Sequence, residues 1–150
     1  MEERLDDLDI SILRVLQEDA RIPFSKLAKM LRVPESTVKF RVKRLLERGI
    51  ITKFAALLNP VKLGYNVTLV IFINCEPRKV NEVFNELCKL KESHHIFQLT
   101  GKYDLITVLH ARDTKEANEI FRTIKNIDGV KEAEMMIATG LLKIKTSLPI

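Results

Sequence analysis

Apolar residues recur every three or four positions in the first third of the chain, which is the spacing of amphipathic helices. One stripe predicts a helix over residues 7–19, with Asp6 and Asp9 at the positive end of its dipole. A second stripe begins after residue 25, and a third lies within residues 36–48. The stripes consist of Leu8, Ile12, Val15 and Leu16, then Leu27, Met30 and Leu31, then Val38, Val42, Leu45 and Leu46. The pattern therefore predicts a unit of three short helices.

Prolines, a serine and a glycine mark the ends of these helices. Pro23 interrupts the first pattern, because proline disfavours helix at the preceding residue, and Ser25 is then placed to cap the second helix. Pro34 suits an early position of the third helix, where its missing N–H has no helical partner. Gly49 provides a left-handed stop. Residues 25–49 therefore form a helix-turn-helix candidate, and the preceding helix completes the unit.

The third helix has a basic surface on the side away from its apolar stripe. Lysine and arginine neutralise phosphates with release of counterions, small hydroxyls reach phosphates or base edges, and an exposed phenylalanine can contact a thymine methyl. A solvated helix face with one stray aromatic is the alternative interpretation, and the two-helix context favours DNA. We expect contacts in the major groove from Ser36, Thr37, Lys39, Phe40, Lys43 and Arg44, with Arg41 on the flank.

Charge is concentrated on the same region. Residues 1–20 hold two basic and seven acidic side chains, whereas residues 21–53 hold ten basic and two acidic ones. Residues 54–150 hold thirteen basic and eleven acidic side chains, and the whole chain carries a formal charge of +5. A chain that was basic only for solubility would be expected to spread its charge more evenly, so the distribution favours a polyanionic partner, double-stranded DNA.

The pattern changes after residue 50. Residues 50–58 are rich in β-forming residues and predict a strand that ends at Asn59-Pro60. Asp113 and Glu116 predict a capping box at the start of a later helix. Strands are further expected at 67–75, 96–100, 104–111 and from near 130 through MMIATGLL (135–142), with helical stripes at 80–88 and 117–124. The order β-α-β-β-α-β predicts a ferredoxin-like fold, with both helices on one face of an antiparallel sheet.

The expected fold class is therefore α+β. A three-helix, winged helix-turn-helix domain occupies residues 1–50, a strand linker residues 51–65, and a ferredoxin-like domain residues 66–150. The strand at 67–75 is nearly continuous in apolar residues, so both of its faces are expected to be buried. Because no further helix remains to cover the open face of the sheet, we expect the same face of a second copy to cover it, in a homodimer.

Several classes of protein and site are disfavoured. The longest apolar run, residues 67–73, is too short to cross a bilayer, and the acidic start lacks the pattern of a signal peptide, so a cytoplasmic protein is expected. Cys75 and Cys88 lack the paired spacing of a zinc or redox site and are expected to be buried thiols. We therefore expect no metal, no cofactor, no membrane partner and no enzymatic activity.

Four stretches together resemble the Lrp/AsnC (feast/famine) family: LDISILRVLQEDAR, VKRLLERGIITKF, NPVKLGY and TGKYD. The resemblance implies DNA-binding transcription regulators built as dimers that often assemble further, up to octamers. It also implies a C-terminal domain that senses small molecules, typically amino acids. From the predicted homodimer we expect a roughly palindromic operator. By similarity, the effector-binding residues are Gly101, Tyr103 and Asp104, and Met135 and Thr139 on the last strand are further candidates for lining the site.

Departures from the family and other interpretations remain. Lys102 stands where family members often carry an acid, which favours an acidic or neutral ligand if its side chain points inward. Residues 101–104 also suit an ordinary hairpin turn. Sirohaem decarboxylases share this layout, and His94, His95 and His110 would matter there, but no convergent acid–base set is visible. A ligand-binding assembly module without DNA contact would be expected to lack the lysines of helix 36–48, which are present.

Overall fold

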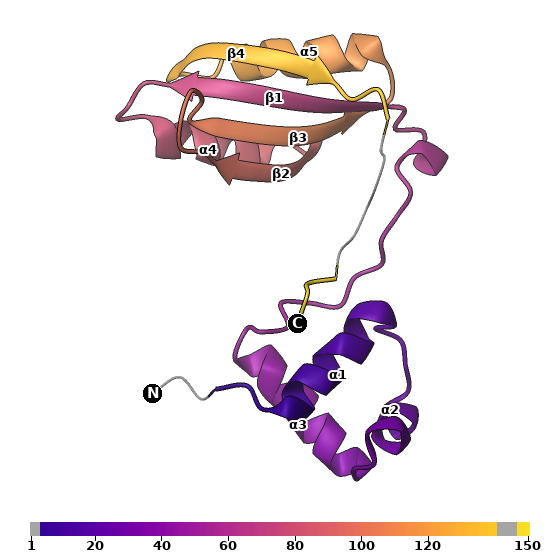
Figure 1. Cartoon of the computed structure of the whole chain (residues 1–150). Coiled ribbons are helices and arrows are strands. Elements are labelled where there is room, and N and C mark those ends of the chain that lie inside the picture. The colour runs from indigo at the N-terminus through magenta and orange to yellow at the C-terminus, as the bar shows by residue number, and fades with distance from the viewer. Residues whose placement is uncertain (1–3, 141–146) are drawn as a thin grey trace. The chain divides into compact units, whose positions relative to one another are not determined.

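Two separate hydrophobic cores organise the chain, one among helices and one between a sheet and two helices. The computed structural model describes residues 4–140 and 147–150 (Figure 1). The described residues divide into two compact units, with the boundary between Leu57 and Leu58. Residues 147–150 group with the helical unit, where the Leu148 N–H donates to Gln17 Oε1 at 2.5 Å. Residues 147–150 therefore pack against the first helix of this unit.

The helical unit consists of the three predicted helices. They are α1 (Asp7–Glu18), α2 (Phe24–Leu31) and α3 (Glu35–Glu47). The apolar stripes meet in one core, in which Ile12, Leu27, Val38 and Leu45 are fully buried. Each such side chain contributes about 1.5–3 kcal/mol to folding by leaving water. Gly49 has a φ of 68°, as predicted for a left-handed stop after α3.

Some local details of the helical unit differ from the sequence predictions. The predicted cap at Ser25 is wrong, because α2 begins at Phe24 and Pro23 occupies the N-cap. The Pro23 carbonyl accepts hydrogen bonds from the N–H groups of residues 26 and 27, so Ser25 lies inside the first turn. Met30 and Leu46 are exposed, so the two stripes are narrower than their periodicity indicated.

The predicted strand at residues 50–58 is also wrong. These residues pair with no strand of the described chain, and residues 4–57 contain no strand that could form a wing. A strand requires a neighbour to satisfy its backbone N–H and C=O groups, and β-forming composition alone does not supply one. Phe54, Leu57 and Leu58 are exposed along this segment. The short 3₁₀ helix η1 (Val61–Leu63) follows at the start of the second unit.

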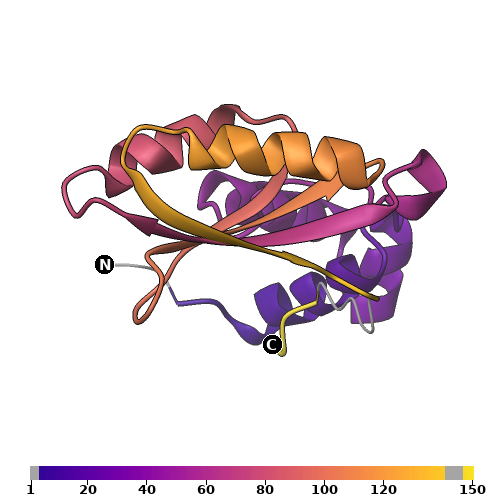
Figure 2. The ribbon, with the colours of Figure 1, turned by 90° about the horizontal axis from the view of Figure 1, so that it is seen from above.

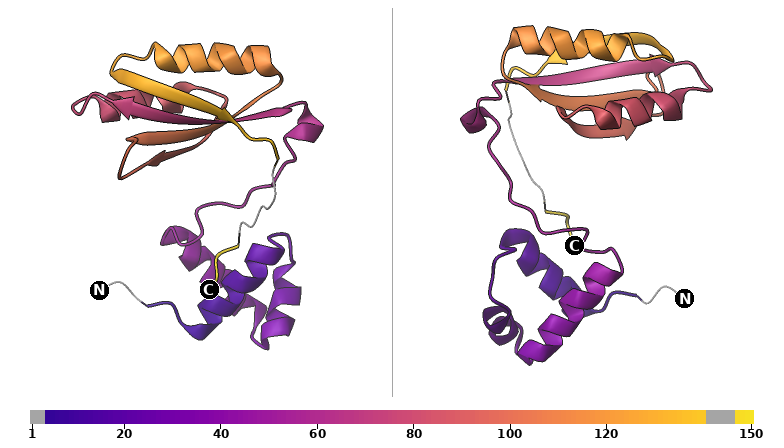
Figure 3. Two further views of the ribbon diagram at one scale, coloured as in Figure 1. Left: turned by 45° about the horizontal axis from the view of Figure 1, so that its top comes forward. Right: turned by 180° about the vertical axis from the view of Figure 1, so that it is seen from behind.

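The second unit is the predicted ferredoxin-like fold. Its elements are β1 (Val67–Cys75), α4 (Val80–Lys89), β2 (Ser93–Gln98), β3 (Leu105–Ala111), α5 (Thr114–Lys125) and β4 (Val130–Ile137). The strands form one antiparallel sheet in the order β2-β3-β1-β4. Both helices cover the same face of this sheet, as Figures 2 and 3 show. The other face, which we call the open face, carries no helix of the described unit.

Burial alternates along β1. Leu69, Ile71 and Ile73 point toward the helices and are fully buried, whereas Val70 and Phe72 lie on the open face and are only partly buried. The inner face of this strand is therefore buried within a single chain, and burial of its open face depends on the predicted second copy. The expectation that a second copy covers the open face stays a prediction.

Smaller differences concern the ends of elements and two side chains. β2 begins at Ser93 because it pairs with β3 from Leu109 onward, three residues earlier than predicted. β4 ends at Ile137, so the predicted continuation of the strand is wrong at residues 138–140, and its last part at 141–142 lies outside the described residues. Cys75 is buried as predicted, whereas Cys88 is exposed on α4.

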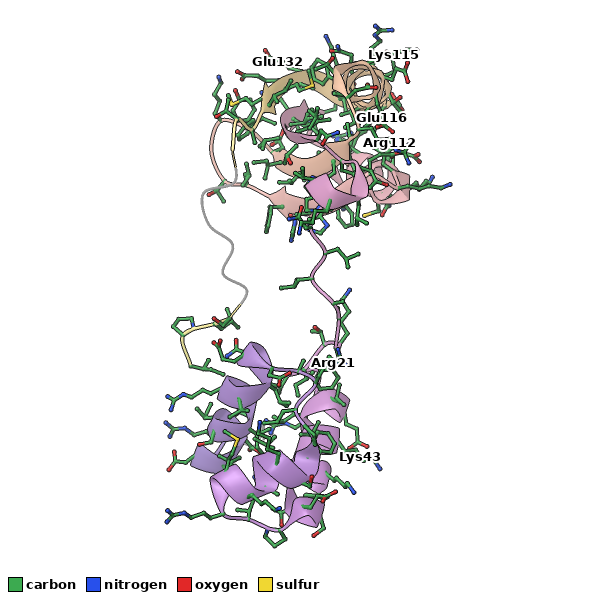
Figure 4. All side chains as sticks on the ribbon, turned by 90° about the vertical axis from the view of Figure 1, so that its right-hand side faces the viewer. Arg21, Lys43, Arg112, Lys115, Glu116 and Glu132 are labelled. Atoms are coloured by element: carbon green, nitrogen blue, oxygen red, sulfur yellow. The ribbon has the colours of Figure 1, made fainter. Side chains whose placement is uncertain are left out.

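The capping box at α5 forms in a modified way. The Asp113 side chain accepts from the Glu116 N–H at 2.8 Å, as predicted. The Glu116 carboxylate accepts from the N–H of Arg112, one residue before the cap, and Figure 4 shows the Arg112 and Glu116 side chains near one another. None of the described helices is long and apolar enough to span a membrane.

Candidate DNA interface and effector site

The outer surface of α3 carries two lysines and a phenylalanine. The side chains of Lys39 and Lys43 are 61% and 76% exposed, and Phe40 is also exposed. Figure 4 labels Lys43 on the helical unit. Lys39 pairs with Glu35 at 2.7 Å and Lys43 with Glu47 at 3.6 Å, each one helical turn away. Exposed pairs of this kind contribute about 0–1 kcal/mol, so a phosphate can replace the glutamate as a partner.

Two hydroxyl side chains lie at the start of the same helix. Ser36 is exposed and Thr37 is half-buried, both in the first turn of α3. The N-terminal turn of a recognition helix is the part that contacts base edges in helix-turn-helix proteins. Ser36, Thr37, Lys39, Phe40 and Lys43 are therefore presented together, as the sequence predicted.

Arg41 and Arg44 do not lie on the outer surface of α3 but point toward α1. Their side chains are only 21% and 23% exposed, and they reach back to the first turn of α1. Arg41 Nη1 lies 2.5 Å from Asp6 Oδ2 and 3.1 Å from Asp9 Oδ1, and Arg44 Nη2 lies 3.1 Å from Asp9 Oδ2. The prediction that Arg44 faces away from the core is wrong, because the buried carboxylate of Asp9 attracts it inward.

We call Asp6, Asp9, Arg41 and Arg44 the aspartate–arginine cluster. Within it, the Asp9 N–H donates to Asp6 Oδ1 at 2.9 Å and the Asp6 N–H donates to Asp9 Oδ2 at 3.3 Å. The Asp9 N–H, and then Arg41, hold the pKa of Asp6 below its usual value. The sequence placed Asp9 at the helix dipole alone. An aspartate within an apolar stripe is the signal that could have indicated an arginine partner, since buried carboxylates require one.

The turn expected to bind an effector joins β2 and β3. Gly101 has a φ of 128°, in the region that favours glycine. Asp104 is held on three sides: its N–H donates to the Ile73 carbonyl at 3.0 Å, its carbonyl accepts from the Leu99 N–H at 2.8 Å, and its carboxylate accepts from the Cys75 N–H at 2.7 Å. The carboxylate of Asp104 therefore has a structural role, fastening the turn to the end of β1.

Tyr103 lies at the open face of the sheet. Its hydroxyl donates to the carboxylate of Glu134 on β4, and its ring centroid lies 5.0 Å from that of Phe72 on β1. Lys102 Nζ lies 4.8 Å from the Tyr103 ring centroid, and the Tyr103 hydroxyl raises the pKa of Lys102. An aromatic ring, an acid and a cation thus gather at one end of the open face.

The other expected effector residues do not join this group. Met135 packs against the core between the sheet and helices, because it follows Glu134 on β4 and points to the opposite face. Thr139 lies exposed beyond the end of β4. Sequence reasoning missed Glu134, although the alternation of side chains along a strand places it on the face of Phe72, with which it pairs.

Three histidines lie close together on β2 and β3. The ring centroid of His94 is 4.3 Å from that of His95 and 5.3 Å from that of His110. His110 Nδ1 lies 3.1 Å from the Thr68 hydroxyl, and burial lowers the pKa of His110. Within residues 4–140 and 147–150, no group of three or more histidine, cysteine or acidic side chains is arranged to hold a metal ion.

Two family models match the chain. The AsnC-type helix-turn-helix domain matches residues 5–46, and the Lrp/AsnC ligand binding domain matches residues 68–148. An uncharacterised HTH-type transcriptional regulator of Pyrococcus abyssi is 43% identical over 141 residues, which cover 93% of this chain and 89% of the relative.

Solved structures of the same family share the fold over nearly the whole length. AsnC of E. coli aligns with a TM-score of 0.90 and 26% identity over 97% of this chain and 99% of that chain. A transcriptional regulator of Neisseria meningitidis, solved in complex with L-methionine, aligns with a TM-score of 0.90 and 29% identity over 97% of each chain.

These proteins are transcription regulators and not enzymes, so the sirohaem decarboxylase alternative is not supported. The helix-turn-helix match likewise disfavours an assembly module without DNA contact. The order of elements, the exposed basic surface of α3 and both family models agree. The chain belongs to the Lrp/AsnC family of DNA-binding transcription regulators.

Proposed function

We propose that the protein is a homodimeric, sequence-specific regulator that inserts α3 into the major groove and responds to an amino acid. In this proposal, residues 1–50 bind DNA, and the domain from residue 66 dimerises and senses the effector. The proposal also places the protein in the cytoplasm, where it would have access to the chromosome. The observation that carries the DNA-binding part is the outward presentation of Lys39, Phe40 and Lys43 from one helix.

The roles of these side chains follow from their chemistry. Lys39 and Lys43 neutralise phosphates and so contribute affinity that depends on salt but not on sequence. Ser36, Thr37 and Phe40 meet base edges, with Phe40 suited to a thymine methyl group. Arg41 and Arg44, expected from the sequence to contact DNA, instead support the helix from inside the unit.

The open face of the sheet supports the proposed dimer. Val70 on β1 lies in register between Val108 on β3 and Met136 on β4, and Phe97 continues the apolar surface on β2. Phe97 and Met136 are 51% and 49% exposed. Monomeric proteins rarely expose contiguous apolar patches of more than a few hundred Å², so a second copy is the economical cover. Assembly beyond a dimer, up to an octamer, remains part of the proposal.

The cluster of Lys102, Tyr103 and Glu134 supports the proposed effector site. A zwitterionic amino acid carries an ammonium and a carboxylate, which suit Glu134 and Lys102 respectively. The relative from Neisseria meningitidis was solved with L-methionine, a neutral amino acid. We therefore propose a neutral amino acid as the effector, bound by Gly101, Lys102, Tyr103 and Glu134.

A DNA-binding titration with matched charge changes tests the proposal. The probes are a duplex recovered by in vitro selection with the wild-type protein and a scrambled duplex of the same composition. Lys43→Glu should weaken binding to both duplexes, whereas Phe40→Ala should lose about 1 kcal/mol or more on the selected duplex alone.

Lys115→Glu provides the control, because it makes the same charge change at an exposed site on α5 of the other unit (Figure 4). It should leave both affinities unchanged. Unaltered binding by Lys43→Glu and Phe40→Ala together would exclude α3 as the recognition helix.

A further inference from the structure

We propose that Asp9 is a positioning residue for DNA recognition, which holds Arg41 and Arg44 away from the phosphates and fixes the face that α3 presents. The inference rests on the proposed DNA-binding function of α3. It assigns a role in sequence discrimination to a side chain that cannot itself touch DNA, because Asp9 is fully buried.

Both carboxylate oxygens of Asp9 accept hydrogen bonds from protein donors. Oδ1 accepts from Arg41 at 3.1 Å, and Oδ2 accepts from Arg44 at 3.1 Å and from the Asp6 N–H at 3.3 Å. A buried carboxylate is strongly unfavourable unless it is both paired and hydrogen-bonded. Asp9 therefore depends on both arginines for its stability. Water cannot replace them as partners, because the carboxylate is fully buried.

The two arginines are three residues apart on α3 and so lie on the same side of the helix. Successive residues of a helix are rotated by about 100° around its axis. A turn of α3 by one residue would remove both guanidinium groups from Asp9. Together with the buried Val38, Val42 and Leu45, this anchor fixes which side chains of α3 point outward. The outward side chains are Ser36, Lys39, Phe40 and Lys43.

The cluster also controls how much charge α3 offers to DNA. Within it, two carboxylates balance two guanidinium groups, so Arg41 and Arg44 are neutralised inside the protein. Contacts to phosphate carry no direct sequence information. A released arginine would therefore raise affinity for any duplex and reduce discrimination between duplexes, and Asp9 prevents this.

The experiment compares Asp9→Asn with the wild-type protein on the selected and scrambled duplexes at several salt concentrations. Asparagine keeps the shape of the side chain but presents an amide donor to arginines that can only donate. We expect the ratio of specific to non-specific affinity to fall by about tenfold or more. We also expect the salt slope on the scrambled duplex to steepen by about 0.9 for each arginine that reaches a phosphate.

Asp128→Asn is the matched control. It weakens an ion pair of similar length, Lys79 Nζ to Asp128 Oδ1 at 2.9 Å, in the sheet unit. The affinity ratio and the salt slope should then remain at their wild-type values. A folded Asp9→Asn protein with the wild-type ratio and slope would overturn the inference and leave Asp9 with a role in stability alone.

Arg44→Gln keeps the test decisive if Asp9→Asn fails to fold, as judged by circular dichroism. A positioning arginine makes no phosphate contact, so Arg44→Gln should reduce the affinity ratio without changing the salt slope. A shallower slope, by about 0.9, would show that Arg44 contacts phosphate and would overturn the inference. A wild-type protein that prefers no duplex would contradict the proposed function and the inference together. An Asp9→Asn protein with wild-type ratio and slope, or a shallower slope for Arg44→Gln, would overturn the inference alone.

Discussion

His110 lies on the open face of the sheet beside two further histidines. Its Nδ1 is 3.1 Å from the Thr68 hydroxyl, and the ring centroid of His94 is 5.3 Å from its own. Burial is the main cause that lowers the pKa of His110, and the nearby His94 and His95 add to it. The folded protein therefore binds a proton at His110 less tightly than the unfolded chain does.

The first prediction is a loss of stability in mild acid. A histidine whose pKa is lowered by folding contributes full stability above its unfolded pKa of about 6.5, and this stability is lost as the pH falls through the lowered folded value. Urea unfolding between about pH 7.5 and about pH 5.5 should show a decreasing free energy of unfolding. His110→Asn should flatten this dependence, and an equally steep profile for the variant would contradict the assignment to His110.

Individual residues were predictable from the sequence where a local rule decides their position. Gly49 has the left-handed conformation of a helix stop, and Lys43 faces outward because it lies opposite the apolar stripe. Arg44 was placed wrongly because its direction depends on Asp9, which is distant in the chain. Glu134 was missed for a similar reason, since its proximity to Tyr103 follows from the pairing of β4 with β1.

At the scale of elements, hydrophobic periodicity predicted the helices and strands whose bounds depend on residues close together in the chain. The bounds of β1 agree with the prediction at both ends, and α1 begins and ends within one residue of it. The strand expected at 50–58 is absent because composition favours an extended backbone but does not provide a neighbour. Helix ends were predicted less well, as at Ser25, because proline and serine both suit the N-terminal turn.

The turn between β2 and β3 gives the second prediction. Asp104→Ala removes the acceptor of the Cys75 N–H and should lower the free energy of unfolding by about 1–3 kcal/mol, the cost of a partly buried donor left unpaired. Asp104→Asn keeps one carbonyl acceptor and should lose less. Thermal unfolding followed by circular dichroism provides the measurement, and a wild-type melting temperature for Asp104→Ala would argue against the structural role.

The third prediction concerns the whole assembly. Val70 lies at the middle of the open face, in register with Val108 and Met136. Val70→Asp should dissociate or unfold the proposed dimer, because an unpaired carboxylate in a dimer interface costs several kcal/mol. Sedimentation velocity at micromolar concentration measures the effect.

The control places the same charge away from the interface. Asn118→Asp adds a carboxylate on the exposed side of α5 and should leave sedimentation unchanged. A wild-type protein that sediments as a folded monomer would contradict the dimer. If the dimer forms, its operator should be roughly palindromic, with half-sites about one helical turn, or a multiple of it, apart.

The last prediction joins the effector to the assembly, because Tyr103 and Glu134 lie on the face through which the dimer is proposed to form. A neutral amino acid such as L-methionine should raise the melting temperature by binding the folded state. Tyr103→Phe should abolish this shift, since it removes the hydroxyl that donates to Glu134 and lies near Lys102. The unliganded variant should melt near the wild-type temperature, because Tyr103 is only partly buried and Phe retains the ring packed against Phe72.

Asp104→Ala separates the two roles that the sequence assigned to this turn, effector binding and the formation of an ordinary hairpin turn. Its carboxylate bonds the backbone of β1, so the variant should melt at a lower temperature but keep a ligand-induced shift of wild-type size. Thermal-shift measurements across the common amino acids provide both readouts. A shift that survives Tyr103→Phe, or no shift with any amino acid, would leave the turn with a structural role alone. The regulator would then act without an effector at this end of the sheet.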